Sequence, residues 1–118
     1  MSFYKTAAAD AGVQALLGNP LRLHPAGDAP EGEAYPYATY QQVGGSPMEL
    51  LGERPSASTQ LIQVDVWAKT NSSAIEVRDA LMHAVELRCS ITSVRGPAKD
   101  PGTGSFRCSF DASWIAQR

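Results

Sequence analysis

The segment from Thr59 to Leu87 constrains the fold more than any other part of this sequence, because its apolar residues change period once along its length. Up to Ala68 the residues alternate between two sides, as they do in one half-buried strand. The inner side of this strand consists of Ile62, Val64, Val66 and Ala68, and the outer side of Leu61, Gln63, Asp65 and Trp67. Beyond a short polar turn the apolar residues recur at helical spacing, which predicts that a helix follows the strand.

The expected helix begins in the polar turn at residues 70–73. Ser73 and Glu76 fit the S-x-x-E capping box, in which two side chains bond free amides at the start of a helix. One face of the helix carries Ala74, Val77, Leu81, Ala84 and Val85. Because the charged residues lie mainly on the other side, we expect the apolar face to pack on the strand.

Further elements complete the expected architecture. Gly18 and Pro20 end a first helix at residues 3–17, because glycine accepts the left-handed cap and proline cannot continue the helix. Further strands are expected at 21–24, 35–43, 89–94 and 106–114. The last of these alternates most regularly. Pro36 cannot donate to a ladder, so it belongs at the beginning or edge of its strand.

These elements predict an α+β fold, in which a mixed, largely antiparallel sheet of about four to five strands carries two helices on one face. A chain of 118 residues fits one domain, residues 1–118, that buries most of its unfolded surface. The expected core consists of Ile62, Val64, Val66, Val77, Leu81, Phe106, Cys108 and Phe110.

The segment at 44–58 is expected to be a long flexible loop, because it opens with Gly-Gly-Ser-Pro and closes with Pro-Ser-Ala-Ser. Its centre is apolar, with Met48, Leu50 and Leu51, which favours docking on another surface. The alternative is a hairpin arm that folds back onto its own core. A second loop is expected at 95–104, where glycine and proline are frequent.

Charge and hydropathy exclude several function classes. The formal net charge is −2, so the chain as a whole is not a nucleic-acid clamp, and no sequence-specific nucleic-acid partner is expected. No apolar run approaches the roughly 20 residues that span a membrane. The N-terminus lacks the basic and apolar blocks of a signal peptide. We therefore expect no membrane partner and a cytoplasmic place of synthesis.

The chain contains two cysteines and two histidines. We interpret Cys89 and Cys108 as buried thiols, with a disulfide between neighbouring strands as the alternative that a reducing compartment disfavours. No C-x-x-C pair accompanies His24 and His83, so a metal site would require an unusual convergence. Neither a metal nor a cofactor is expected.

The sequence contains no motif typical of catalysis. The glycine-rich run at 102–105 precedes a strand, whereas phosphate binding requires the amides of a helix N-terminus. A buried carboxylate at Asp65, beside Gln63, can be functional. We expect instead that it faces solvent or a partner subunit. No catalytic residue is predicted, and the chain is not expected to be an enzyme.

Three apolar side chains lie on strand faces that are otherwise polar: Leu61, Trp67 and Ile115. Exposed apolar residues on small proteins often mark contact surfaces, and tryptophan is enriched at binding hot spots. Together with Met48, Leu50 and Leu51 they form the predicted subunit or partner interface.

The order of these pieces resembles the tail completion family of long-tailed, siphophage-type phages, which includes tail terminator and tail-to-head joining proteins. The resemblance rests on the helix end at 9–18, L-R-L-H-P at 21–25, Y-P-Y-A-T-Y-Q-Q-V at 35–43, Q-V-D-V-W-A at 63–68, A-x-x-V-R-D-A-L at 74–81 and F-R-C-S-F-D-A-S-W at 106–114. These are signatures of a fold and carry no catalytic group.

The resemblance implies a structural virion protein of a phage or prophage. Such proteins form rings, commonly sixfold, that cap the tail tube and join it to the head. The implied partners are other copies of the chain in a hexamer, the tail tube protein and a head-completion protein, and the implied location is the virion after assembly in the host cytoplasm. Other head-tail connectors or minor tail components are the alternative, followed by a small α+β ligand-binding domain or enzyme, because fold does not fix function.

Overall fold

The computed structural model describes residues 2–50 and 53–117, and it describes the side chains of residues 2–44 and 59–114. Within those residues the elements follow in the order α1 (Phe3–Ala8), α2 (Ala11–Leu17), β1 (Leu23–Pro25), β2 (Tyr37–Leu50), β3 (Glu53–Ala68), α3 (Asn71–Val85), β4 (Cys89–Lys99) and β5 (Phe106–Gln117). None of the helices in these ranges is long and apolar enough to cross a membrane.

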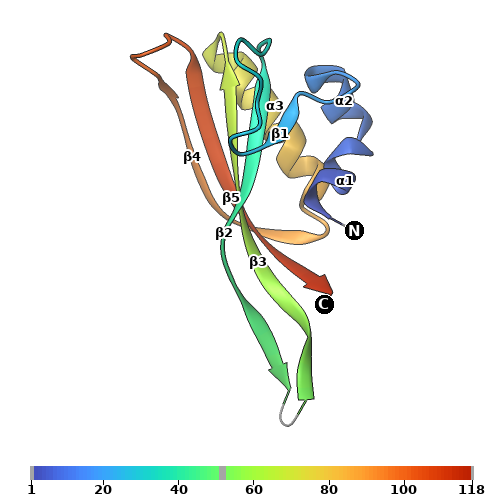
Figure 1. The fold of residues 1–118 in the computed structure, drawn as a ribbon. Helices are drawn as coiled ribbons and strands as arrows, with labels where there is room; N and C mark the ends of the chain where they lie inside the picture. Colours follow the sequence, from blue (N-terminus) through green and yellow to red (C-terminus); the bar gives the residue numbers. More distant parts are fainter. Residues whose placement is uncertain (1, 51–52, 118) are drawn as a thin grey trace.

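The five strands form one sheet in the order β1-β2-β3-β5-β4. The short β1 runs parallel to β2, and the other neighbours are antiparallel. All three described helices lie on the same side of the sheet, and α3 packs against β3, β5 and β4 (Figure 1). The predicted α+β class and the mixed, largely antiparallel sheet are therefore confirmed.

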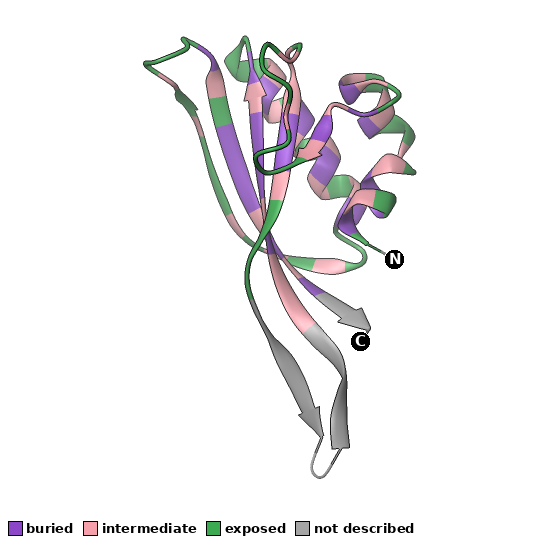
Figure 2. Ribbon diagram, viewed as in Figure 1, coloured by how far each residue is buried: buried purple, intermediate pink, exposed green. Residues whose placement is uncertain are grey.

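The predicted core forms between α3 and the inner side of the sheet (Figure 2). Its buried members include Ile62, Val64, Val66, Val77, Leu81, Cys108 and Phe110. Phe106 is only partly buried and packs against the margin of this cluster, because it is the first residue of β5 at one end of the sheet. Two alternating strands and one helical stripe thus bury each other, as their periods predict.

The first helix differs from its prediction, because residues 3–17 form two helices and not one. The break lies at Ala9 and Asp10, where the Asp10 carboxylate accepts a hydrogen bond of 3.0 Å from the Val13 amide. An aspartate in extended backbone conformation is a strong N-cap, so it starts a second helix there. Gly18 ends α2 at the predicted place and has a positive φ of +85°, but its ψ of 178° lies outside the left-handed helical conformation that was expected.

The start of α3 also differs from its prediction. Thr70 is the N-cap, and its hydroxyl accepts a hydrogen bond of 3.1 Å from the Ser73 amide. Ser73 therefore lies inside the first turn, and the expected capping box of Ser73 and Glu76 does not form.

The segment at 44–58 is not an irregular loop. The described part of it is a hairpin arm in which β2 and β3 continue to pair, from Gly44 opposite Leu61 to Leu50 opposite Glu53. Figure 1 shows this arm extending from the sheet well beyond the helices, and the molecule measures 53 × 29 × 24 Å. The alternative of a hairpin arm is correct in its secondary structure, although the arm projects and does not fold back onto the helix-covered core. Its flexibility stays a prediction.

The second expected loop, at 95–104, is also shorter than predicted, because β4 continues to Lys99. The strand passes an irregularity between Arg95 and Ala98, where Gly96 has φ of +83°. A Cβ atom on Gly96 would lie 2.9 Å from the carbonyl oxygen of Arg107, so this close approach requires glycine.

Candidate assembly surfaces

The side of the sheet opposite the helices forms the first candidate surface, which we call the open face. Strand register places its side chains in three rows: Tyr37, Trp67 and Arg107; Thr39, Asp65 and Ser109; and Gln41, Gln63 and Asp111. The middle row is buried although no described helix covers it. Larger neighbours on the same face must therefore shield it.

Trp67 is one of these neighbours, and it lies between two other side chains. Its ring stacks on that of Tyr37 at 5.3 Å between centroids, and the Arg107 guanidinium lies 5.6 Å from the ring centroid on the neighbouring strand. Tyr35 extends the aromatic row, with its ring 5.6 Å from that of Tyr37. Stacking and cation–π contacts hold this group in place and leave it partly exposed at one end of the open face.

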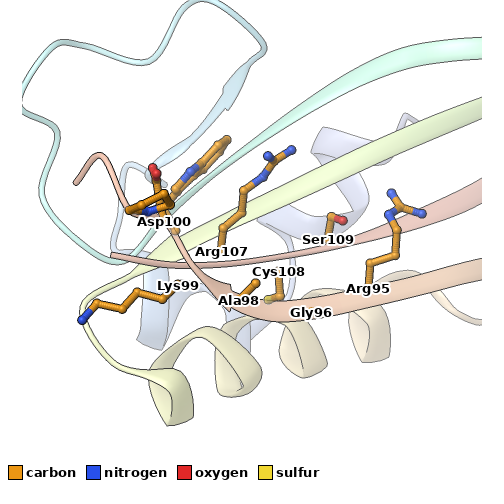
Figure 3. A pocket seen from close by; sticks show the side chains of 10 residues that line it. Arg95, Gly96, Ala98, Lys99, Asp100, Arg107, Cys108 and Ser109 are labelled. Atoms are coloured by element: carbon orange, nitrogen blue, oxygen red, sulfur yellow. The ribbon is translucent and has the colours of Figure 1, made fainter. Parts of the chain in front are cut away.

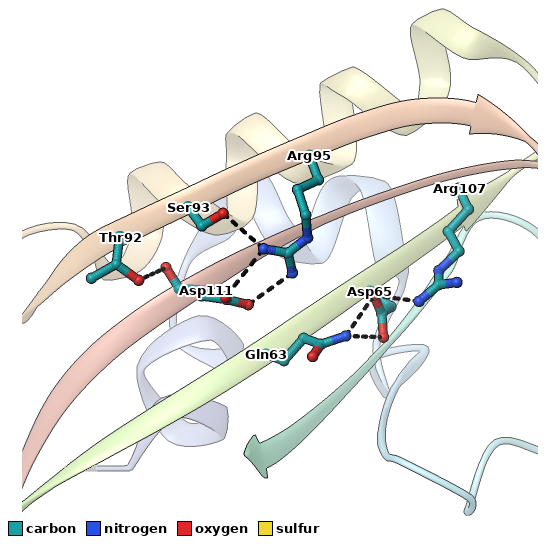
Figure 4. A network of polar contacts seen from close by, with 7 residues as sticks. All are labelled: Gln63, Asp65, Thr92, Ser93, Arg95, Arg107 and Asp111. Carbon is teal, nitrogen blue, oxygen red and sulfur yellow. Dashed lines mark hydrogen bonds and ion pairs between the residues drawn. The ribbon is translucent and has the colours of Figure 1, made fainter. Parts of the chain in front are cut away.

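Asp65 is the buried carboxylate of the open face, with 6% of the residue exposed. Its oxygens accept hydrogen bonds from Arg107 at 3.2 Å and from the Gln63 amide at 3.2 and 3.3 Å (Figure 4). The expectation that Asp65 faces solvent or a partner subunit is therefore wrong for solvent. The carboxylate is engaged within the chain, where it ties β3 to β5.

A second ion pair crosses from β4 to β5 on the same face. The Arg95 guanidinium donates two hydrogen bonds to the Asp111 carboxylate, at 2.9 and 3.1 Å, and a third to the Ser93 hydroxyl at 2.8 Å (Figure 4). The hydrogen bond with Asp111 raises the pKa of Arg95. This bidentate geometry aligns the edge strand β4 with β5.

A hollow of about 630 Å³ lies where the open face meets the end of β4, and Trp67, Arg95, Lys99, Asp100 and Arg107 are among the residues that line it (Figure 3). Arg107 and Arg95 are bound to Asp65 and Asp111, and Figure 3 shows Lys99 extending away from them. The Asp100 carboxylate accepts hydrogen bonds from the Gly102 amide and the Thr103 hydroxyl, both at 3.0 Å. Contacts within the chain therefore hold three of the charged side chains that line the hollow, namely Arg95, Arg107 and Asp100.

Of the predicted interface residues, the structure describes the side chains of Leu61 and Trp67 only, and these two do not share one patch. Leu61 and Trp67 are both half-buried on the open face, but they lie six residues apart on β3, which is roughly 20 Å along a strand. Ile115, opposite Thr59, and Met48, opposite Ala57, belong to the arm and its base, and the structure does not describe their side chains. Leu50 ends β2, and Leu51 lies outside the described residues.

Residues that sequence reasoning missed complete the surface around Trp67. Tyr37 and Arg107 carry the stacking contacts, and the signal that identifies them is register: both lie directly opposite Trp67 on neighbouring strands. That register follows from the pairing of three strands and is not contained in any one of them.

The second candidate surface is the edge at β1 and the following loop. His24 Nε2 lies 2.6 Å from a Glu33 carboxylate oxygen, and the other oxygen of Glu33 accepts from the Ala34 amide at 2.9 Å. These two hydrogen bonds lower the pKa of Glu33, that from His24 most. A hollow of about 740 Å³ beside this loop is lined by Glu31, Glu33, Tyr35 and Lys69 among others.

Both cysteines are free thiols, and Cys108 is buried as predicted, whereas Cys89 is only partly buried. Cys89 lies opposite Trp114, and Cys108 lies six residues earlier on β5, so the two cannot bond to each other in this register. Cys108 donates to the Ala74 carbonyl at 3.3 Å, and burial raises the pKa of both thiols. In the described part of the chain no three His, Cys, Asp or Glu side chains gather as a metal site would require. His83 is exposed on α3.

Comparison with known proteins agrees with the fold. The family model described as tail completion protein gp17 matches residues 2–112. A chain in the virion of a native gene transfer agent particle is similar in structure, with a TM-score of 0.78 and 13% identity over 99% of this chain and 92% of that one. The gp17 protein of bacteriophage SPP1 is similar with a TM-score of 0.53 and 10% identity, over 92% of this chain and 84% of that one. No curated protein matches.

Proposed function

Because this chain belongs to the family of tail completion protein gp17, we propose that it forms a ring at the head-proximal end of a phage tail, where it stops growth of the tail tube and joins the tail to the head. Tail completion is the role of the family, and the chain is a structural protein of the virion. The match to the family model over residues 2–112, which include every described element except the last residues of β5, carries this proposal.

The shape of the chain supports a ring. A closed ring requires two different surfaces on each copy, which meet head to tail. The sheet has two unlike edges, β1 and β4, and the arm formed by β2 and β3 extends away from the helices (Figure 1). The partners that we propose are the neighbouring copies in a ring of six, the tail tube protein and a head-completion protein.

The open face supports a role without catalysis. Its buried carboxylate, Asp65, is bound by Arg107 and Gln63, and its two arginines are held in ion pairs with aspartates. Such side chains stabilise the sheet. We propose that the chain folds as one domain in the host cytoplasm and enters the virion by docking.

A deletion in the phage or prophage that carries this chain tests the proposal. Electron microscopy of lysates should show tails of irregular length and heads without tails, because the tube end stays uncapped and cannot join. Supplying the wild-type chain in trans should restore tails of uniform length attached to heads. Normal virions in the absence of the chain would contradict the proposal.

A further inference from the structure

Two segments at opposite edges of the sheet carry opposite charge. Residues 26–35, which follow β1, contain Asp28, Glu31 and Glu33 and neither lysine nor arginine. Residues 87–99, which include β4, contain Arg88, Arg95 and Lys99 and neither aspartate nor glutamate. We call these segments the acidic loop and the basic edge. The net charge of the whole chain is only −2, so it does not show that acidic and basic residues are concentrated at different edges.

Strand register fixes the two segments on either side of the sheet. One row of paired residues runs from His24 on β1 through Thr39, Asp65 and Ser109 to Arg95 on β4. Four strand spacings separate the ends of this row, which is roughly 19 Å. At one end of this row His24 forms an ion pair with Glu33 of the acidic loop, and at the other end Arg95 belongs to the basic edge. Copies placed side by side in the plane of the sheet would therefore bring the acidic loop of one against the basic edge of the next.

Each edge carries charged side chains that form no ion pair within the described part of the chain, so these charges can interact with another molecule. Asp28 and Glu31 are exposed and form no ion pair among the described residues, although Lys69 lines the same hollow as Glu31. Within the same part of the chain, Arg88 and Lys99 are likewise exposed and in no ion pair. Glu33 and Arg95, in contrast, are held by His24 and Asp111.

Neither edge has a further strand beside it in the described sheet, because β1 and β4 are the two ends of the strand order. The β1 strand pairs with β2 only at Ala38, Thr39 and Tyr40. The outer side of β4 has no strand beside it in the described sheet, since β4 ends the strand order. Basic residues on an edge strand disfavour hydrogen bonding to a strand of another molecule. They still allow contact with a surface of opposite charge.

We propose that the acidic loop of one copy docks on the basic edge of the next copy, and that this contact sets the lateral order of the ring. The inference rests on the proposed function, because it names the surfaces that a head-to-tail ring requires. A second copy fits better than another partner, since both halves of the contact are present on one chain and lie on opposite edges. Complementary charge gives such a contact its register and its rate of formation.

Single charge reversals with matched controls test the proposal. Glu31→Lys and Lys99→Glu each reverse one exposed charge in the contact, whereas Glu76→Lys and Lys5→Glu reverse exposed charges on helices. Ring formation is measured by native mass spectrometry and by electron microscopy on purified tail tubes that lack the chain, at low and high salt. At low salt each contact variant should require about tenfold more protein than its control to form rings, because like charges then meet at every boundary. High salt should narrow the difference.

An equal mixture of Glu31→Lys and Lys99→Glu provides the decisive result. At alternate boundaries the introduced lysine faces the introduced glutamate, and at the others the native pair meets, so the mixture should form rings near the wild-type concentration with strictly alternating copies. Variants that form rings as their controls do, or a mixture that fails as each variant alone does, would overturn the proposed contact and leave the ring itself standing. A wild-type chain that forms no ring in solution or on tubes would overturn the ring as well.

Discussion

The carboxylate of Asp65 lies on a sheet face that no described helix covers, yet only 6% of the residue is exposed. Arg107 and Gln63 account for this, because they bond the carboxylate and cover it at the same time. A charge in such a position is costly unless it is paired and hydrogen-bonded. The sequence shows that Asp65 is mid-strand, but its partner Arg107 lies 42 residues away and is brought near only by the pairing of β3 with β5.

At the same scale, we predict that Phe110→Ala lowers the free energy of unfolding by about 3–5 kcal/mol, because it leaves a cavity in the core. Phe110 is fully buried, between β5 and α3. Phe106→Ala is the matched control and should cost less, since Phe106 is only partly buried. Denaturant unfolding of both variants checks this. Equal costs would show that β5 is not packed in this register.

A second prediction at residue scale concerns Glu33. The hydrogen bond from His24, and then that from the Ala34 amide, hold the pKa of Glu33 below its ordinary 4.5. Because the pKa is lower in the folded chain, the ionised carboxylate contributes stability above pH 4.5, which is lost as the pH falls through the folded value. Glu33→Gln should therefore be less stable than wild type at neutral pH, and the difference should shrink on acidification. Melting temperatures between pH 3 and 7 test this, and a difference that grows towards low pH would contradict it.

At the scale of elements, the caps decide where the helices begin. Four residues in a row, Thr70 to Ser73, are all able to cap a helix, so the sequence pattern cannot choose among them. The prediction of one helix at residues 3–17 was wrong for a similar reason. The alanine-rich sequence favours helix throughout, so it does not indicate that Asp10 caps a second helix. The positions of the alternating strands were predictable, since burial of one face of a strand requires apolar residues at every second position. The lengths of β2 and β4 were not, because they depend on the neighbouring strands with which they pair.

We predict that Thr70→Ala lowers the free energy of unfolding by about 1 kcal/mol, because the Ser73 amide loses its acceptor. Ser73→Ala is the matched control, and it should have little effect, since the Ser73 side chain is not the cap. Unfolding in urea distinguishes the two variants. A larger cost at Ser73 than at Thr70 would restore the capping box.

The arm of β2 and β3 carries a prediction of its own. The sequence places apolar Leu50 and Leu51 at its end, which favours burial against a neighbouring subunit or the tail tube. The double variant Leu50→Asp with Leu51→Asp should leave the chain folded, because the arm lies away from the core, and should block incorporation into tails. Hydrogen exchange in the free chain should be faster in the arm than in β5 at Phe110.

Complementation of the deletion with this double variant provides the readout, and Glu76→Lys serves as a control for added surface charge. Head-attached tails of uniform length with the double variant would show that the arm is not an assembly surface. Slow exchange throughout the arm of the free chain would contradict its expected flexibility.

At the scale of the whole molecule, the sheet carries its helices on one side and continues into a protruding arm, and the proposed ring is argued from this arrangement. The α+β class and the core were predictable, because apolar periods determine which faces meet. The open face and the two charged edges were not, because they depend on strand order β1-β2-β3-β5-β4, which no single segment encodes.

The most direct test of the central claim is a cryo-electron microscopy reconstruction of the neck of virions that carry this chain. We predict one ring of copies between the last ring of the tail tube and the head, with the sheet edges of neighbouring copies in contact. The account would be contradicted by finding the chain at the distal tip of the tail, inside the head or as isolated copies that touch no neighbour.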